Sequence, residues 1–339
     1  LNRPRLNRAA RYQALIKALK ALAKAQGHPT ADELRQIANV VAFNQNAIDA
    51  LPVLTFHNEK RVWRIEGPFD SNYSLSLVNR ETARALKAQG EEVFLHSSEG
   101  PGDYPPNESF LALNHPDILT LWRDRAEIDM RDRPVIASRN LYPPRVDNGG
   151  GTVNILHSYA WEESRFPSEW VDQFNLHLDG IGSVSSHVSK LLQDSGVAVP
   201  LSVVGNGVDH WERVKAAKLE SLPGKSFRFL HVSSCFPRKG ADVLLAAYGQ
   251  AFRRSDDVTL IIKTFKNPHN DIEARLAAAR TQDPEFPDVA LIFEDLPDPE
   301  LKALYQHCHV LVAPSRAEGY GLPIAEATLS GLPVIVTAW

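Results

Sequence analysis

Short apolar runs alternate with segments of helical spacing along most of this chain, and this alternation restricts the folds it can adopt. In the first half, strands are predicted at Val62–Ile65, Glu92–His96, Pro134–Ser138, Val153–His157 and Ile181–Ser183. Helices are predicted at 75–87 and 186–194. Because strands that alternate with helices build parallel sheets flanked by helices, we expect an α/β, Rossmann-like domain over residues 58–208.

A second series of the same kind begins at Phe227. Its predicted strands are Phe227–Val232, Val258–Lys263, Ala290–Phe293, Val310–Ala313 and a last one from Val334 to Trp339. The intervening helices are one with Leu244, Tyr248, Ala251 and Phe252 on one face, Ile272–Arg280, Glu300–His307, and one after Gly321. The turn-like segment Asn206–His210 marks the boundary, so a second Rossmann-like domain is expected over 209–339. Such folds bind ligands beyond the carboxyl ends of their strands, here in the cleft between two facing domains.

The composition is that of a globular protein and excludes several other classes. The 339 residues are 43% hydrophobic and 23% charged, and a chain of this length favours two domains. The net charge of −4 gives no reason to expect nucleic acid as a partner. Two cysteines, Cys235 and Cys308, exclude a disulfide framework. Without a long apolar run or a secretory signal, a cytoplasmic location is expected.

The first 57 residues form a predicted helical segment outside both domains. Residues 1–24 carry seven basic side chains and no acidic one, with apolar residues at helical spacing. The segment either contacts the inner face of an anionic membrane or forms a linker whose apolar side packs against the two domains. The linker is favoured because apolar residues at helical spacing usually belong to a protein core. Because the chain starts at Leu1 and ends on an apolar strand, we expect further domains of a longer polypeptide and an incomplete second domain.

Two glutamates, Glu318 and Glu326, enclose the most informative motif of the chain. Between them Gly319-Tyr320-Gly321 forms a turn that opens a helix, directly after an apolar strand. A helix N-terminus offers free N–H groups and partial positive charge to an anion, and glycines let the backbone approach it closely. Carboxylates accept hydrogen bonds from sugar hydroxyls. The motif therefore predicts a site for a sugar nucleotide.

A second candidate element follows the first strand of the second domain, at Ser233–Gly240. Its adjacent cations Arg238 and Lys239 suit a diphosphate, since charge-assisted hydrogen bonds contribute about 1.5–3 kcal/mol each. The alternative is a solvated basic turn. The glutamate motif, which we place two strands away in the same sheet, favours the ligand site.

Together these motifs resemble the GT-B retaining glycosyltransferases of family four, also called glycosyltransferase group 1. The family's paired glutamates match Glu318 and Glu326, and its lysine–glycine pair matches Lys239-Gly240. Its domain-linking segment resembles Asn206–Asp209. The resemblance covers residues 60–339.

The resemblance implies a role for each motif residue. Glu318 would bind donor-sugar hydroxyls at the reacting centre, and Glu326 would accept from the nucleotide ribose. The N–H groups of Gly319, Tyr320 and Gly321 would hold the diphosphate, and Lys239 would neutralise it. In the first domain, His157 resembles the family's active-site histidine and would position the sugar; the alternative is a hydrogen-bonded core histidine.

One position departs from the family pattern. Where the family carries arginine, five residues before the lysine, this chain has Ser234. Either Arg238 or Lys263 supplies the missing cation, or phosphate binding is weakened. Lys263 is favoured by its place at a strand end. No Asp-x-Asp pair occurs in the sequence, so a metal-independent site without cofactors is expected. The His307-Cys308-His309 cluster is interpreted as incidental.

The acceptor is expected to contact loops of the first domain. Candidate contacts are Asn72, Arg139, Trp161 and Glu162, because aromatic rings and polar groups suit saccharides. The resemblance implies hexosyl transfer from a nucleotide-diphosphate sugar to a glycan such as a surface polysaccharide, with retention at the anomeric carbon. Two alternatives stay open: a non-catalytic GT-B module that binds glycan or nucleotide within a larger protein, and a nucleotide-sugar 2-epimerase.

Overall fold

The computed structural model describes residues 61–338 except 127, 129–132 and 220–221. The predicted helical segment 1–57 lies outside this part of the chain. Two compact units are present. The first comprises the described residues up to His157 with 167–181 and 193–200; the second comprises 158–166, 182–192 and the chain from Leu201 onward. The predicted domain boundary at 208/209 stays a prediction.

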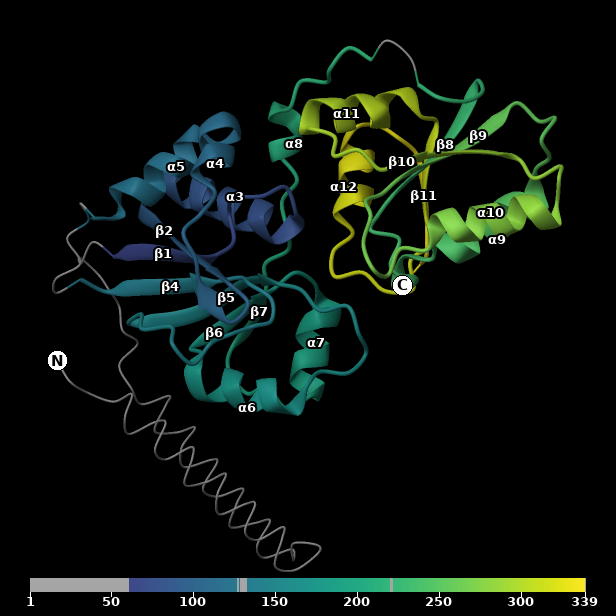
Figure 1. Ribbon diagram of the computed structural model, residues 1–339. Coiled ribbons are helices and arrows are strands. Elements are labelled where there is room, and N and C mark those ends of the chain that lie inside the picture. The colour runs from purple at the N-terminus through teal and green to yellow at the C-terminus, as the bar shows by residue number, and fades with distance from the viewer. Residues whose placement is uncertain (1–60, 127, 129–132, 220–221, 339) are drawn as a thin grey trace, which may run out of the picture. The chain divides into compact units, whose positions relative to one another are not determined.

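The first sheet has seven strands in the order β3-β2-β1-β4-β5-β6-β7 (Figure 1). The strands are β1 (Val62–Gly67), β2 (Glu92–Glu99), β3 (Gly102–Asp103), β4 (Val135–Arg139), β5 (Val153–Tyr159), β6 (Gly180–Ser183) and β7 (Leu201–Val203). β1 pairs in parallel with β2 and β4, and β4 with β5, whereas the short β3 is antiparallel to β2. The sheet is therefore the parallel one that the alternating pattern predicts.

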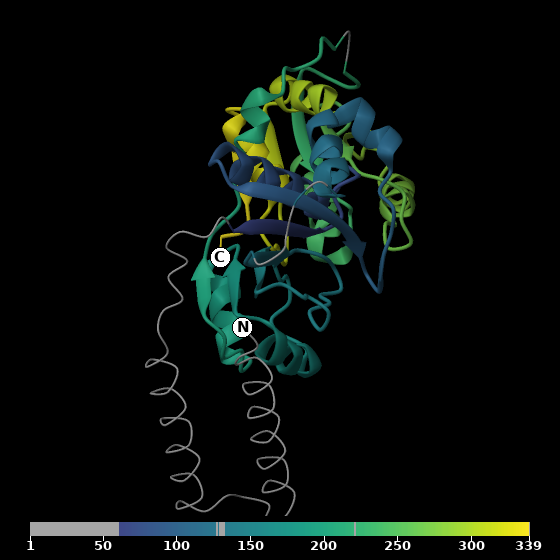
Figure 2. The same ribbon diagram turned by 90° about the vertical axis from the view of Figure 1, so that its left-hand side faces the viewer.

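Helices of this part of the chain pack on the sheet through apolar side chains. They are α3 (Ser74–Ala88), α4 (Glu108–Asn114), α5 (Pro116–Arg123), η1 (Asp124–Ala126), α6 (Ser168–His177) and α7 (Ser186–Asp194). Ile65 and Leu95 of β1 and β2 share one buried cluster with Ala83, Leu111 and Ile118 of the helices. Helices α6 and α7 lie at the β6–β7 end of the sheet (Figures 1 and 2).

The second sheet has five strands in the order β10-β9-β8-β11-β12, and every pair in it is parallel. The strands are β8 (Phe227–Val232), β9 (Val258–Lys263), β10 (Asp288–Ile292), β11 (Val310–Ala313) and β12 (Val334–Val336). The strand order reverses at β8, because the chain continues to β9 on one side and returns to β11 on the other. In open α/β sheets such a reversal leaves a ligand-binding crevice beyond the carboxyl ends of the strands.

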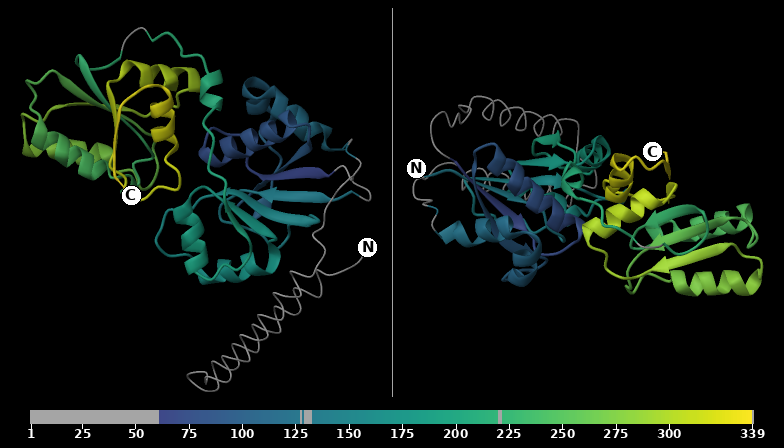
Figure 3. Two further views of the ribbon diagram at one scale, coloured as in Figure 1. Left: turned by 180° about the vertical axis from the view of Figure 1, so that it is seen from behind. Right: turned by 90° about the horizontal axis from the view of Figure 1, so that it is seen from above.

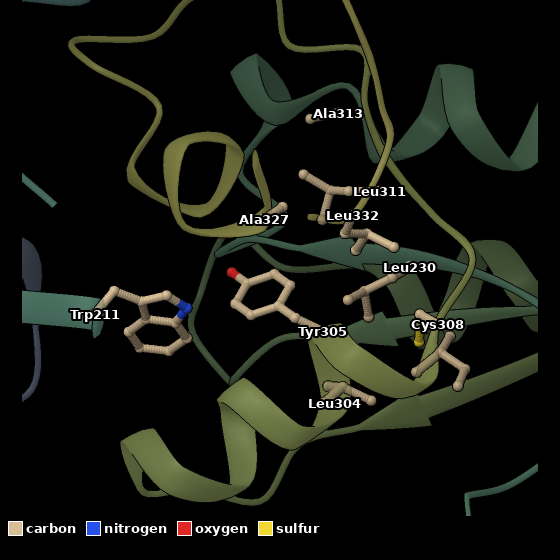
Figure 4. Close-up of a cluster of buried hydrophobic side chains, with 10 residues drawn as sticks. Trp211, Leu230, Leu304, Tyr305, Cys308, Leu311, Ala313, Ala327 and Leu332 are labelled. Carbon is tan, nitrogen blue, oxygen red and sulfur yellow. The ribbon is translucent and has the colours of Figure 1, made fainter. Parts of the chain in front are cut away.

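Helices cover both faces of the second sheet (Figure 3). They are α8 (His210–Arg213), η2 (Pro237–Lys239), α9 (Ala241–Ala251), α10 (Ile272–Gln282), α11 (Asp298–His307) and α12 (Leu322–Leu329). Alternate residues of β9 point to opposite faces. Ile261 joins the cluster around Trp211 and Tyr305 (Figure 4), whereas Leu260 and Ile262 join the cluster of α9 and α10.

The predicted fold class is confirmed, with differences in detail. Strands β8, β9 and β11 and helix α7 match their predicted bounds. β3, β7 and helices α4, α5, α6 and α8 were not predicted from the sequence. Ala251 is exposed and not on the buried face of α9, since the helix ends there. Among the described helices, none is long and apolar enough to cross a membrane.

Candidate functional site

Lys239 and Glu318 meet at the carboxyl edge of the second sheet. Lys239 ends η2 after β8, and Glu318 lies in the loop between β11 and α12. The Nζ atom of Lys239 is 2.6 Å from Oε2 of Glu318, and the two side chains are 14% and 19% exposed. The hydroxyl of Ser315 donates to the other carboxylate oxygen at 2.7 Å. β8 and β11 are neighbours, so the two motifs are closer than the two-strand separation expected from sequence.

The two loops touch through their backbones. Gly240 has a φ of 70°, in the left-handed region, and a Cβ there would overlap the carbonyl oxygen of Pro314. The amide of Arg316 donates to the carbonyl of Arg238 at 2.7 Å. Glycine is thus required both for its φ and for the close approach, which fixes the spacing between Lys239 and Glu318.

The N-terminus of α12 is open. Its N-cap, Gly321, has a φ of 82° and provides no side-chain cap. Across the described residues, no protein acceptor takes a hydrogen bond from the backbone N–H of Gly319, Tyr320 or Gly321. Uncapped N–H groups and the positive end of the helix dipole favour an anion beside Glu318 and Lys239.

The position where the family carries arginine lies in the loop after β8. The Ser234 carbonyl accepts from Asn267 at 3.0 Å, and its neighbourhood contains two candidate cations. Arg238 lies 2.8 Å from Glu162, which belongs to the same compact unit. Lys263 ends β9 beside Val232 and donates to the Thr264 carbonyl at 3.1 Å. Burial lowers the pKa of Lys263, and the nearby carboxylates of Asp295 and Glu294 oppose this.

Glu326 is buried, with 6% of its surface exposed. The Tyr305 hydroxyl donates to its Oε2 at 3.1 Å, and Nε2 of His210 lies 3.9 Å from Oε1. Burial raises the pKa of Glu326 to about 8, although the hydrogen bond from Tyr305 acts in the opposite direction. This carboxyl therefore keeps its proton to a higher pH than an exposed glutamate does. Its predicted contact with ribose stays a prediction.

His157 lies at the end of β5 with both ring nitrogens hydrogen-bonded. Asn79 donates through Nδ2 to the carbonyls of Pro68 and Asn140, so its Oδ1 is the acceptor for His157 Nε2 at 2.9 Å. Nδ1 then accepts from Ser138 at 2.9 Å. Burial lowers the pKa of His157 to about 4, which keeps the ring neutral near pH 7. The ring holds the loops after β1 and β4 in place; its predicted contact with the sugar stays a prediction.

The four acceptor candidates lie in different environments. Asn72 is exposed in the loop before α3. Arg139 is buried, paired with Glu66, and donates to the Arg145 carbonyl. Trp161 donates to the Arg165 carbonyl at 2.8 Å, and Glu162 pairs with Arg238. The geometry favours a structural role for Arg139, and contact of any of the four with an acceptor stays a prediction.

The site contains residues that sequence reasoning did not select. Ser315 lies three residues before Glu318, inside the motif, so the motif itself was a signal. Tyr305 and His231 come from predicted elements but carry no pattern that marks them. Their roles depend on the buried polar groups that they contact. The spacing of residues along the chain does not predict these contacts.

Within the portion of the chain that the structure describes, no three His, Cys, Asp or Glu side chains lie close enough together to hold a metal ion. His307 Nδ1 lies 2.8 Å from the Ala303 carbonyl, and His309 Nδ1 accepts from the Arg228 amide at 3.0 Å. Both rings therefore hold local backbone. The expectation of a metal-independent reaction stays a prediction.

The second sheet and its loops have known relatives. Residues 226–339 match the family model described as glycosyl transferases group 1. They form a glycosyltransferase group 1 domain. This confirms the family resemblance noted from the paired glutamates and the lysine–glycine pair.

Curated relatives match this chain in part. The serotype-specific mannosyltransferase WbdA of Escherichia coli is 28% identical over 141 residues, which are 42% of this chain and 16% of the relative. D-inositol 3-phosphate glycosyltransferase 1 of Catenulispora acidiphila is 29% identical over 132 residues, 38% of this chain and 31% of the relative. The matched region thus spans less than a third of either relative.

The fold extends beyond the matched domain. Sucrose-phosphate synthase from Thermosynechococcus elongatus superposes with a TM-score of 0.56 at 17% identity, covering 82% of this chain and 81% of that one. At this identity the likeness establishes the fold alone, for both sheets of the chain.

Proposed function

We propose that this chain is a glycosyltransferase that moves a hexosyl unit from a nucleotide-diphosphate sugar to a glycan acceptor. The observation that carries the proposal is the Lys239–Glu318 pair beside the uncapped N-terminus of α12. The cation suits the negative charge of the phosphates, and the open N–H groups can donate to the phosphate oxygens. The carboxylate can accept hydrogen bonds from the sugar hydroxyls.

The proposed chemistry is support of a departing diphosphate. As the bond from the anomeric carbon to the phosphate oxygen breaks, negative charge grows on the phosphate and the sugar becomes oxocarbenium-like. Lys239 then exchanges Glu318 for a phosphate oxygen, and the amides of 319–321 donate to the same group. Preorganised donors of this kind usually supply the largest share of catalysis. Glu318, oriented by Ser315, accepts from sugar hydroxyls.

Lys263 is proposed as the further cation that replaces the arginine absent at Ser234. It lies at the carboxyl end of β9, beside β8, and so faces the same edge of the sheet. Arg238, which lies 2.8 Å from Glu162, is the second candidate for this cation. Glu326 is proposed to contact the ribose after a local rearrangement, and His157 to position the sugar.

The finer features of the reaction rest on family resemblance and relatives. Retention and independence from metal follow the family. The name of the mannosyltransferase relative makes mannosyl donors the first to test. A surface polysaccharide as acceptor follows the family resemblance. For the basic residues of 1–24, peripheral contact with a membrane stays the alternative to the linker role that the sequence favours.

A thermal-shift panel with UDP, GDP, ADP and their sugars tests the site. A ligand at 100 times its Kd stabilises by about 2.7 kcal/mol, so the correct base gives a clear rise in Tm. Lys239→Ala is expected to reduce the rise for the nucleotide diphosphate more than for the nucleoside. Absence of any shift with every base would contradict the proposal. Product analysis without acceptor separates a transferase from an epimerase, because the epimerase needs no acceptor.

A further inference from the structure

His231, at the end of β8, is 1% exposed and lies in a hydrogen-bond chain that the proposed reaction does not use. Its Nδ1 is 2.7 Å from the carbonyl oxygen of Val312, and its Nε2 is 2.7 Å from the hydroxyl of Ser233. A carbonyl only accepts, so Nδ1 carries the proton and Nε2 is the acceptor. The Ser233 hydroxyl therefore donates to His231.

The same hydroxyl oxygen accepts from the backbone amide of Cys235 at 3.0 Å. Cys235 has a φ of 53°, in the left-handed region that side chains other than glycine rarely adopt. Such a conformation persists only where surrounding contacts fix it. The hydrogen bond to Ser233 is one contact that fixes it, beside the Asn267 side chain that binds the Ser234 carbonyl.

The chain of hydrogen bonds joins the two strands from which the candidate site is built. Cys235 leads through Phe236 into η2 and Lys239, and Val312 lies just before the loop that carries Glu318. The charges of Lys239 and Glu318 also act on the His231 ring, the first lowering its pKa and the second raising it. A shift of this ring would thus be transmitted to both halves of the site.

We propose that His231 and Ser233 are positioning residues that set the loop after β8, and with it Lys239, for the diphosphate. The path runs from the Cys235 amide through the Ser233 hydroxyl and the His231 ring to the Val312 carbonyl. The inference rests on the proposed function for the identity of the ligand. The geometry of the loop itself does not depend on it.

Three variants separate this role from a general contribution to stability. Ser233→Ala removes the hydroxyl, and Ser233→Thr keeps it as the conservative rescue. His231→Asn keeps a donor for Val312 at the place of Nδ1 but removes the acceptor for Ser233. The proposal expects Ser233→Ala and His231→Asn to behave alike and Ser233→Thr to resemble the wild type.

Hydrogen–deuterium exchange tests the loop without any nucleotide. In Ser233→Ala, exchange is expected to rise about tenfold in 236–240 and 314–318, where Lys239 and Arg316 donate backbone hydrogen bonds, and to stay unchanged in β9. Unchanged exchange in both loops would overturn the proposal. Faster exchange in all three segments would also overturn it, because the role would then be global.

Affinity gives the second readout. Ser233→Ala is expected to bind the nucleoside diphosphate about threefold to tenfold more weakly, the range for one lost hydrogen bond, and the nucleoside equally well. Equal losses for both ligands would contradict a positioning role. If the wild type binds no nucleoside diphosphate, the proposed function fails, while the exchange experiment still decides the inference.

Discussion

The hydroxyl of Tyr305 lies 3.1 Å from Oε2 of Glu326, and the pair is buried between α11 and α12. Tyr305 belongs to the apolar cluster that also includes Trp211 (Figure 4). A carboxyl in such surroundings ionises with difficulty. The second glutamate of the motif is thus part of the domain's core in this structure, whereas the first faces a cation at the sheet edge.

This burial predicts a stability that depends on pH through Glu326. Its pKa is raised to about 8 in the folded state, above the usual value of 4.5, so the stabilising proton is lost as pH rises through about 8. The free energy of unfolding should fall by several kcal/mol between pH 5 and pH 9. Glu326→Gln, which stays neutral, should remove this slope in urea unfolding at both pH values. Equal slopes in the two proteins would contradict the assignment.

His157 predicts the opposite dependence. Its pKa is lowered to about 4, below the unfolded value of 6.5, so its contribution is present above pH 6.5 and is lost as pH falls toward 4. The difference between the wild type and His157→Asn should shrink by about 3 kcal/mol from pH 7 to pH 4. Chemical unfolding at the two pH values measures it, and a difference independent of pH would show that the ring is not held neutral.

Lys263 is predicted to contribute to diphosphate binding. Lys263→Ala should lose most of the thermal shift with the preferred nucleoside diphosphate and keep the shift with the nucleoside, because only the charged ligand needs the cation. Lys266→Ala is the matched control, since Lys266 lies close in sequence but its side chain is 75% exposed. An unchanged shift in Lys263→Ala would assign the missing cation to another residue.

Gly240 is predicted to be essential for the approach of the two site loops. Gly240→Ala adds both left-handed strain, about 1–2 kcal/mol, and a collision with the Pro314 carbonyl. Gly331 has a similar φ of 75° but open space around its Cβ, so Gly331→Ala reports the strain alone. We expect only Gly240→Ala to weaken nucleotide binding beyond its loss of stability. Equal effects in both variants would show that the loops tolerate separation.

Strands of the second sheet such as β9 and β11 could be predicted because each is a short apolar run with buried side chains. Val258–Lys263 is an example, with four consecutive buried residues. Helices α4 and α5 could not, since they are short and α5 begins at Pro116 directly after α4. Lys239 and Glu318 meet because β8 and β11 are neighbours in the sheet. The sequence pattern does not give the strand order, and it placed the two motifs two strands apart.

The environments of single side chains were less predictable than their elements. The motif predicted a ribose contact for Glu326 but gave no sign that this side chain is buried beside Tyr305. The ring of His157 was weighed as either a site residue or a core residue, and its two hydrogen bonds are decided by Asn79 and Ser138. These partners come from segments far away in the sequence, so the spacing of residues along the chain does not predict them.

The most direct test of the account is release of nucleoside diphosphate from a panel of nucleotide sugars by the whole polypeptide, with and without glycan acceptors. The wild type should turn over at least one donor. Glu318→Ala should lower the rate at least about a hundredfold, the scale for loss of a group that stabilises the transition state, without loss of folding. Glu273→Ala, on an exposed helix face, should not change it. Equal turnover by wild type and Glu318→Ala, or none with any donor, would contradict the central claim.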